Sequence, residues 1–174
     1  MQLDTYFSGV WQDQNFESLK YSGYQLVDYV NAKKPTRVLD VGCGFNKFKG
    51  KIDHLWGIDP YNDAADVKCS IEGYDGPMVD IALCLGSINF GDEETIDHQI
   101  EILDGIWMKE CIFRVNPGLT HTWVDKSDID GVIWYPWTKE KVYEIAKQYK
   151  YNVDRFEKEY TIHGHLRYYF VFTK

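Results

Sequence analysis

The 174-residue chain has no long apolar run, and this absence limits where we expect it to work. No stretch approaches the roughly 18–20 consecutive apolar residues that a membrane-spanning helix needs. Residues 1–5 also lack the basic start and following apolar stretch of a secretory signal. We therefore expect a cytoplasmic protein that does not span a membrane.

Cysteine is scarce, with four residues and no CxxC pair: Cys43, Cys69, Cys84 and Cys111. Free thiols buried in a reducing cytoplasm explain them best, and a zinc site or a disulfide is the alternative. We expect no metal. His163 and His165 lie two residues apart and could contact one, but no third ligand is evident and a solvent-facing turn explains them as well.

Basic residues are also fewer than acidic ones: the chain has 19 Lys and Arg and 27 Asp and Glu, which gives a net charge of −8. Extended nucleic-acid binding relies on clustered cations, so we do not expect it, although a local basic patch remains possible. The chain is instead rich in apolar residues (44%) and aromatic residues (16%). That content suits one globular domain with one core.

Short apolar runs alternate with helical patterns from residue 36 onward. Seven runs predict strands, at residues 37–41, 55–58, 65–68, 78–85, 111–115, 153–161 and 166–173. Helical spacing covers residues 94–108 and 138–149, the second with Thr138 as N-cap. The pattern predicts a mostly parallel α/β sheet that ends in an antiparallel pair. Ligands of such sheets bind outside the carboxyl ends of the strands.

Residues 1–34 look like a separate helical segment, because Pro35 stops the helical pattern before the first strand. We expect an N-terminal helical cap at 1–34 and one main domain at 35–174. The aromatic side chains of Tyr6, Phe7 and Trp11 suit either a lid over a ligand or a cap on the core.

The first strand ends in an aspartate and two glycines, at Asp40, Gly42 and Gly44. Glycine permits positive φ and lets the backbone approach a ligand closely. The dinucleotide fingerprint GxGxxG needs a third glycine where Lys47 stands, so that fingerprint fails. A second carboxylate, Asp59, ends the next strand and is suited to accept hydrogen bonds from both hydroxyls of a ribose.

Three segments together resemble the class I S-adenosylmethionine-dependent methyltransferases: VLDVGCG at 38–44, GID at 57–59 and VDIALCLGS at 79–87. The resemblance covers roughly residues 36–173 and implies a three-layer Rossmann-like sandwich with a seven-stranded sheet. It implies S-adenosylmethionine as cofactor and assigns it a set of binding residues. The methionine part would lie against Asp40, Gly42, Cys43 and Gly44, the ribose against Asp59, the adenine against Pro60, Tyr61, Ser70 and Ile71, and the methionine and reacting methyl near Leu85, Gly86 and Ser87.

Two features depart from the family pattern. Asn46 stands where the family often has a small residue, and the chain from Gly44 to the second strand allows only about two helical turns. Asp59 is only about seven residues from the predicted third strand, too few for the usual crossover helix. We therefore expect the helix between the second and third strands to be missing.

The catalytic candidates are weak. Asn89 could orient an acceptor or serve a turn. Arg114 could bind an acidic substrate or pair with a carboxylate of the chain, and His121 could act as a general base. The aromatic loop at 134–137 suits either an acceptor wall or helix packing. The exit of the fourth strand lacks the motifs for methylating nucleobase amino groups or cytosine carbon, so those acceptors are disfavoured.

The sequence therefore favours a methyltransferase whose acceptor is a small molecule or an exposed site on a larger one. A non-catalytic protein that binds the cofactor or serves as a scaffold is the first alternative. A nicotinamide-dependent oxidoreductase is the second, and the absent GxGxxG speaks against it. The acceptor atom and the oligomeric state are not encoded in any motif we find, and fold alone does not fix function.

Overall fold

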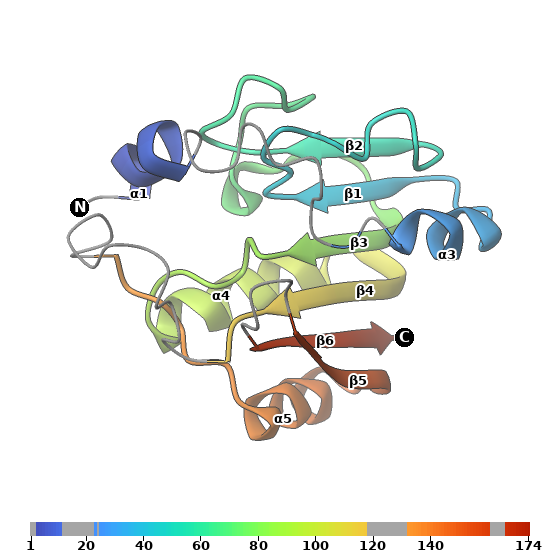
Figure 1. The fold of residues 1–174 in the computed structure, drawn as a ribbon. Coiled ribbons are helices and arrows are strands. Elements are labelled where there is room, and N and C mark those ends of the chain that lie inside the picture. The colour runs from blue at the N-terminus through green and yellow to red at the C-terminus, as the bar shows by residue number, and fades with distance from the viewer. Residues whose placement is uncertain (1–2, 12–22, 24, 118–131, 161–165) are drawn as a thin grey trace.

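The computed structural model describes residues 3–11, 23, 25–117, 132–160 and 166–174, which contain a six-stranded sheet of order β2-β1-β3-β4-β6-β5 (Figure 1). The strands are β1 Val38–Val41, β2 Leu55–Ile58, β3 Val79–Leu85, β4 Trp107–Val115, β5 Asn152–Tyr160 and β6 Leu166–Thr173. Strands β1 to β4 run parallel, and β6 runs antiparallel to both of its neighbours. The predicted mostly parallel sheet with a C-terminal antiparallel pair is confirmed.

The predicted strand at residues 65–68 is wrong, so the described sheet has six strands rather than seven. Val67 makes only an isolated parallel bridge with Ile58. The carboxylate of Asp66 explains this, because its Oδ2 accepts a hydrogen bond of 2.8 Å from the backbone N–H of Gly57 on the outer edge of β2. That donor is therefore not available to a carbonyl of a further strand.

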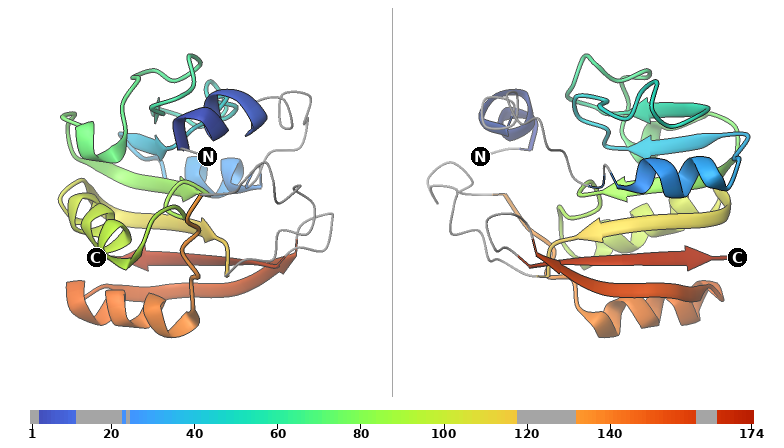
Figure 2. Two further views of the ribbon diagram at one scale, coloured as in Figure 1. Left: turned by 90° about the vertical axis from the view of Figure 1, so that its left-hand side faces the viewer. Right: turned by 45° about the vertical axis from the view of Figure 1, so that its right-hand side comes forward.

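Helices cover both faces of the sheet, and the three-layer arrangement is confirmed (Figure 2). Helices α4 (Glu93–Asp104) and α5 (Lys139–Tyr149) pack on one face and bury residues such as Ile100 and Val142. Helix α3 (Leu26–Ala32) packs on the opposite face, where Leu26 and Val30 join a second apolar cluster. The continuous apolar run of β3 follows from this burial on both sides.

Two boundaries differ by four residues from the sequence-based expectation, and the others by at most one. Helix α4 ends at Asp104 rather than 108, and β4 begins at Trp107 rather than 111. Gly105 ends the helix, and its N–H bonds back to the carbonyls of Ile102 and Leu103. Trp107 keeps the helical spacing of the apolar residues before it, which is why the pattern misleads. The predicted N-cap of α5 is confirmed, since the Thr138 side chain accepts from the N–H of Lys141.

The two connections beside β2 contain no α-helix. Residues 59–78 form turns and one short 3-10 helix, Ile71–Gly73, so the expected absence of the crossover helix holds across this fully described segment. Residues 42–54 form turns as well, so the two helical turns expected there are absent. Phe48 and Ile52 from these turns pack into the cluster that contains α3. Turns thus cover a sheet surface that a helix was expected to cover.

The first described segment holds α1 (Leu3–Thr5) and a π-helical turn, Tyr6–Val10. It lies beyond the edge at which the arrows of β1, β3 and β4 end, opposite to the direction of β6 (Figure 1). The division at residues 34 and 35 stays a prediction. No helix within the described ranges is long and apolar enough to cross a membrane.

Candidate functional site

A cavity of about 750 Å³ lies at the carboxyl ends of the parallel strands. It is lined by every residue that the sequence nominated for cofactor binding. These are Asp40, Gly42, Cys43, Gly44, Asp59, Pro60, Tyr61, Ser70, Ile71, Leu85, Gly86 and Ser87. Of the catalytic candidates, Asn89 and Arg114 also line the cavity. His121 lies outside the described residues, as do His163 and His165.

The turn after β1 needs both of its glycines. Gly42 and Gly44 adopt φ values of +68° and +53°, in the left-handed region that favours glycine. A Cβ on Gly42 would lie 2.4 Å from the Cβ of Ser87, and one on Gly44 would lie 2.7 Å from the ring of Trp11. The backbone of this turn is therefore brought close to the cavity and to the loop after β3.

Asp59 organises the backbone around the cavity. Its Oδ2 accepts from the N–H of Gly44 at 2.9 Å, and its Oδ1 accepts from the N–H groups of Tyr61 and Asn62 at 2.8 and 2.9 Å. The side chain thus joins the turn after β1 to the loop after β2. A carboxylate offers about four lone-pair sites, so three donors leave capacity for a ligand hydroxyl.

Asp40 differs from Asp59 because nothing in the described ranges pairs with it. Its side chain is buried, with the residue 3% exposed, and its carboxylate makes no hydrogen bond or ion pair to any described residue. Burial, and secondarily the charge of Asp59, raises the pKa of Asp40 to about 7. A buried carboxylate without a partner is unfavourable unless a cation or donors reach it. The cavity beside it is where such a group would enter.

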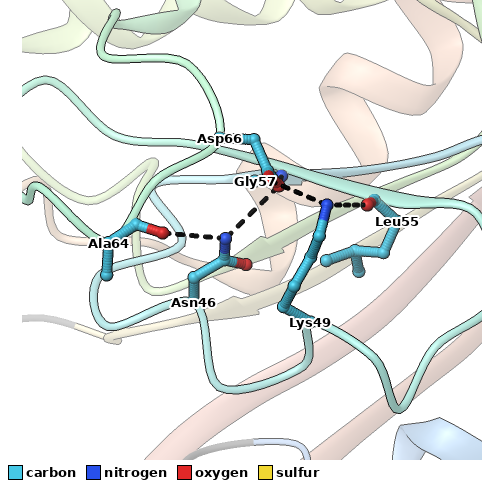
Figure 3. Close-up of polar contacts among 6 residues, drawn as sticks. All are labelled: Asn46, Lys49, Leu55, Gly57, Ala64 and Asp66. Atoms are coloured by element: carbon cyan, nitrogen blue, oxygen red, sulfur yellow. Dashed lines mark hydrogen bonds and ion pairs between the residues drawn. The ribbon is translucent and has the colours of Figure 1, made fainter.

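Asn46 fastens the turn after β1 to the loop that follows β2 (Figure 3). Its φ is +51°, and its Nδ2 donates to Ala64 O at 3.0 Å and to Asp66 Oδ2 at 3.3 Å. Lys49 pairs with Asp66 Oδ1 at 2.7 Å and donates to the carbonyl of Leu55. Asn46 stands in place of a small residue because its side chain makes these contacts.

Asp66 is charged within this network. Burial alone would raise the pKa of the Asp66 carboxyl, but hydrogen bonds from Gly57, Lys49 and Asn46 outweigh burial and lower that pKa. The packing is close, since a Cβ on Gly57 would lie 2.7 Å from Asn46 Oδ1. Polar contacts thus hold the loop that takes the place of the crossover helix.

The loop after β3 is joined to the end of β4. Asn89 is 1% exposed, and its Oδ1 accepts from the N–H of Asn116 at 2.9 Å. The Nε1 of Trp137 donates to the carbonyl of Ile88 at 2.8 Å. The bond from Asn116 gives the Asn89 side chain a structural role, and this side chain also lines the cavity.

Several aromatic rings line the cavity and pack against one another. Phe7 stacks on Tyr61 with centroids 5.4 Å apart, and Trp11 stacks on Phe45 at 5.2 Å. Phe7 also meets Phe90 edge to face at 4.9 Å. The segment 3–11 therefore contacts the loops after β1, β2 and β3, and Tyr6 in it is buried at 2% exposure. The role of the N-terminal segment as a lid or a cap stays a prediction.

The aromatic residues of the loop at 134–137 lie in two different environments. Trp134 lines the cavity and lies 4.5 Å from Phe90, centroid to centroid. Tyr135 and Trp137 instead belong to the apolar cluster under α4 and α5. One ring faces the cavity, and two hold the loop on the core.

No protein-family model matches the chain, and no curated protein matches it in sequence. Solved structures do match. The magnesium protoporphyrin IX methyltransferase of Synechocystis PCC 6803, solved with bound S-adenosylhomocysteine, superimposes with a TM-score of 0.75 at 12% identity, over 98% of this chain and 97% of that one.

The 1,6-didemethyltoxoflavin-N1-methyltransferase of Burkholderia thailandensis gives a TM-score of 0.73 at 13% identity, over 99% of this chain and 87% of that one. The N-methyltransferase NodS of Bradyrhizobium japonicum WM9 gives 0.65 at 12% identity, over 94% and 97%. The chain has the class I methyltransferase fold. At these identities the likeness concerns the fold, and the chemistry must be argued from the cavity.

Within this methyltransferase fold, Arg167 at the start of β6 is a charged cavity residue that sequence reasoning missed. Ligand contacts were expected only at the ends of strands. Because β6 runs antiparallel to β4, its beginning lies at the edge where the parallel strands end. The predicted hairpin at 153–173 was the signal that could have directed attention to it.

Of the two roles expected for Arg114, the structure shows the pairing with a carboxylate of the chain. Its Nε donates to Glu159 Oε2 at 2.9 Å, and both side chains are largely buried, at 13% and 23% exposure. The arginine therefore has a carboxylate of the chain as partner. The four cysteines are free thiols, two of them buried and two partly exposed.

Proposed function

We propose that this protein is an S-adenosylmethionine-dependent methyltransferase. The observation that carries the proposal is Asp40, a buried carboxylate without a partner among the described residues, beside a cavity of about 750 Å³. S-adenosylmethionine carries an ammonium and a sulfonium, and a cation close to Asp40 would relieve the cost of burying its charge. The crystallised structural relatives that hold S-adenosylmethionine or S-adenosylhomocysteine support the same reading.

The residues around Asp40 fit the cofactor part by part. We infer that Gly42, Cys43 and Gly44 lie against the methionine part, where left-handed glycines leave the backbone uncovered. Asp59 would accept from a ribose hydroxyl with its remaining lone pair. The adenine would lie between the Pro60–Tyr61 pair and the Ser70–Ile71 pair, and Leu85, Gly86 and Ser87 would face the methionine and the reacting methyl.

The cofactor supplies an activated methyl group, and the chain has to orient the acceptor and exclude water. Alignment of two reactants can lower a barrier by roughly 7–11 kcal/mol, so no strong acid or base is required. The rings of Phe7, Phe90 and Trp134 pack against one another and line the cavity, where they would exclude water. Asn89, Arg114 and His121 stay weak catalytic candidates, and the first two already have partners within the chain.

The acceptor in this proposal is a small molecule, or an exposed site that can enter beneath the aromatic rings. Residues 1–34 would then act as a cap whose first described segment closes the cavity. We do not expect extended nucleic acid as a partner, because the chain carries a net charge of −8.

Calorimetry with S-adenosylhomocysteine and with NAD tests the proposal, followed by mass spectrometry of an acceptor panel with S-adenosylmethionine. We expect micromolar binding of S-adenosylhomocysteine, no binding of NAD and a mass gain of one methyl on at least one acceptor. Tight cofactor binding without any methylated product would favour a non-catalytic binder. No binding of S-adenosylhomocysteine by the native chain would contradict the proposal.

A further inference from the structure

Two arginines line the cavity on the side away from β2. Arg114 lies near the end of β4, and Arg167 lies near the start of β6. The strands pair Val115 with Tyr168, so Arg167 is the next residue of β6 at the edge of the sheet. The cavity thus has acids, Asp40 and Asp59, on one side and arginines on the other.

The charges of this second side do not balance within the described residues. Glu159 pairs with Arg114 through a bond of 2.9 Å from the arginine Nε. Arg167 donates a hydrogen bond of 2.9 Å to the backbone carbonyl of Leu166 and makes no ion pair with a described carboxylate. Burial, and secondarily the charge of Arg114, lowers the pKa of Arg167 to about 10, and the guanidinium remains charged at neutral pH. Arg167 is therefore a charged residue of the cavity that has no carboxylate partner among the described residues.

Aromatic side chains line the same cavity as Arg167. The end of β4 is joined to the loop after β3 by the bond from Asn116 N–H to Asn89 Oδ1. The next residue of that loop, Phe90, packs against Trp134, and both rings line the cavity. A ligand that binds Arg167 and extends into the cavity would therefore also meet aromatic side chains.

We propose that the acceptor is a small ring compound with one carboxylate, and that Arg167 binds this carboxylate. This inference rests on the proposed methyltransferase function, because it assigns the other end of the same cavity to the cofactor. The planar fork of arginine matches the two oxygens of a carboxylate. The single charge of Arg167 suits a monoanion, whereas a phosphate dianion would add excess negative charge to a cavity that also holds Asp40, Asp59 and Glu72.

Matched fragments test the proposal by ligand-observed NMR, with and without saturating S-adenosylhomocysteine. The fragments are benzoate, its neutral amide benzamide, and phenyl phosphate. We expect the native protein to bind benzoate at least about tenfold tighter than benzamide, as one charge-assisted hydrogen bond predicts. Phenyl phosphate should bind more weakly than benzoate.

Variants locate the preference. Arg167→Gln should abolish the preference for benzoate, and Arg167→Lys should retain part of it, because lysine keeps the charge without the fork. Far-UV circular dichroism shows that each variant is folded, whether or not S-adenosylhomocysteine binds. Arg155→Gln is the matched control, since Arg155 lies on neighbouring β5, pairs with Glu157 at the surface and does not line the cavity. That variant should keep the full preference.

The proposal is overturned if benzoate and benzamide bind equally, if phenyl phosphate binds more tightly than benzoate, or if Arg167→Gln keeps the preference. Failure of the proposed function is a separate result. If S-adenosylhomocysteine does not bind but benzoate is still preferred through Arg167, the anion site stands and the cofactor assignment falls.

Discussion

The two halves of the sheet support their ligand loops by different means. Around β1 and β2, short turns replace helices, and side chains such as Asn46, Asp59 and Asp66 hold the backbone by hydrogen bonds. Around β3 and β4, the helices α4 and α5 pack an apolar cluster against the sheet, and the loops rest on it through Trp137. One cavity is thus held mainly by polar contacts on one side and by apolar packing on the other.

The largest expected loss lies on the apolar side. Trp137→Ala removes a ring that is 1% exposed, leaves a cavity under α5 and deprives the carbonyl of Ile88 of its donor. We expect the free energy of unfolding to fall by about 3–5 kcal/mol, measured by urea denaturation. A loss below about 1 kcal/mol would mean that the loop does not depend on this packing.

The strongest test of the polar side is Asp66→Ala. The change removes the acceptor of Gly57 N–H, the ion pair with Lys49 and one bond of Asn46. We expect a loss of about 2–3 kcal/mol in the free energy of unfolding, together with weaker binding of S-adenosylhomocysteine. Unchanged binding with lowered stability would separate this network from the cavity.

Acid should act on the same network. The pKa of Asp66 is lowered in the folded protein, so its contribution to stability is present above the ordinary aspartate pKa and is lost as pH falls through the folded value. The difference in stability between the native protein and Asp66→Ala should therefore shrink below about pH 4. Urea denaturation at pH 7 and pH 3.5 checks this, and a constant difference would contradict it.

Asp40 should behave in the opposite way. Its folded pKa of about 7 lies above the ordinary value, so the folded state holds the proton more strongly and stability falls as pH rises from about 4 to about 7. Asp40→Asn should remove this slope and raise the free energy of unfolding at pH 8 by on the order of 2 kcal/mol. Thermal denaturation between pH 5 and pH 8 measures the effect. A variant less stable than the native protein at pH 8 would show that Asp40 has a structural partner.

The smallest effect is expected at Asp63, which is the control for Asp66. Asp63 lies in the same loop and pairs with Lys68, but both side chains are exposed, at 90% and 58%. Asp63→Ala should leave the urea midpoint and the affinity for S-adenosylhomocysteine unchanged, because water and salt screen such pairs. A loss comparable with that of Asp66→Ala would mean that any charge in this loop is important.

The sequence predicted the parts of the fold that depend on burial. The apolar run of β3 and the helical spacing of α4 and α5 are strong signals, and they correctly indicated where parallel strands end. The cavity residues were assigned by the resemblance to class I methyltransferases, and they lie at or just after those strand ends. Patterns failed where side chains bind the backbone instead: the strand at 65–68 is replaced by the contacts of Asp66, which no periodicity encodes.

Within the cavity, residue types were predictable and partners were not. Asp40 and Asp59 look alike in sequence, each ending a strand, yet Asp59 accepts from three backbone N–H groups and Asp40 from no described residue. The difference arises because the loop after Asp59 turns its N–H groups back toward the carboxylate. Arg167 was missed because its approach to the cavity depends on the direction of β6, a property of tertiary pairing.

The carboxylate of Asp40 has no partner among the described residues, and we propose that a cationic cofactor provides one. Calorimetric titration of S-adenosylmethionine into native protein and Asp40→Asn at pH 8 tests it most directly. We predict micromolar binding by the native protein and at least about tenfold weaker binding by the variant, the loss expected for one charge-assisted hydrogen bond. Equal affinity in a folded variant would contradict the account.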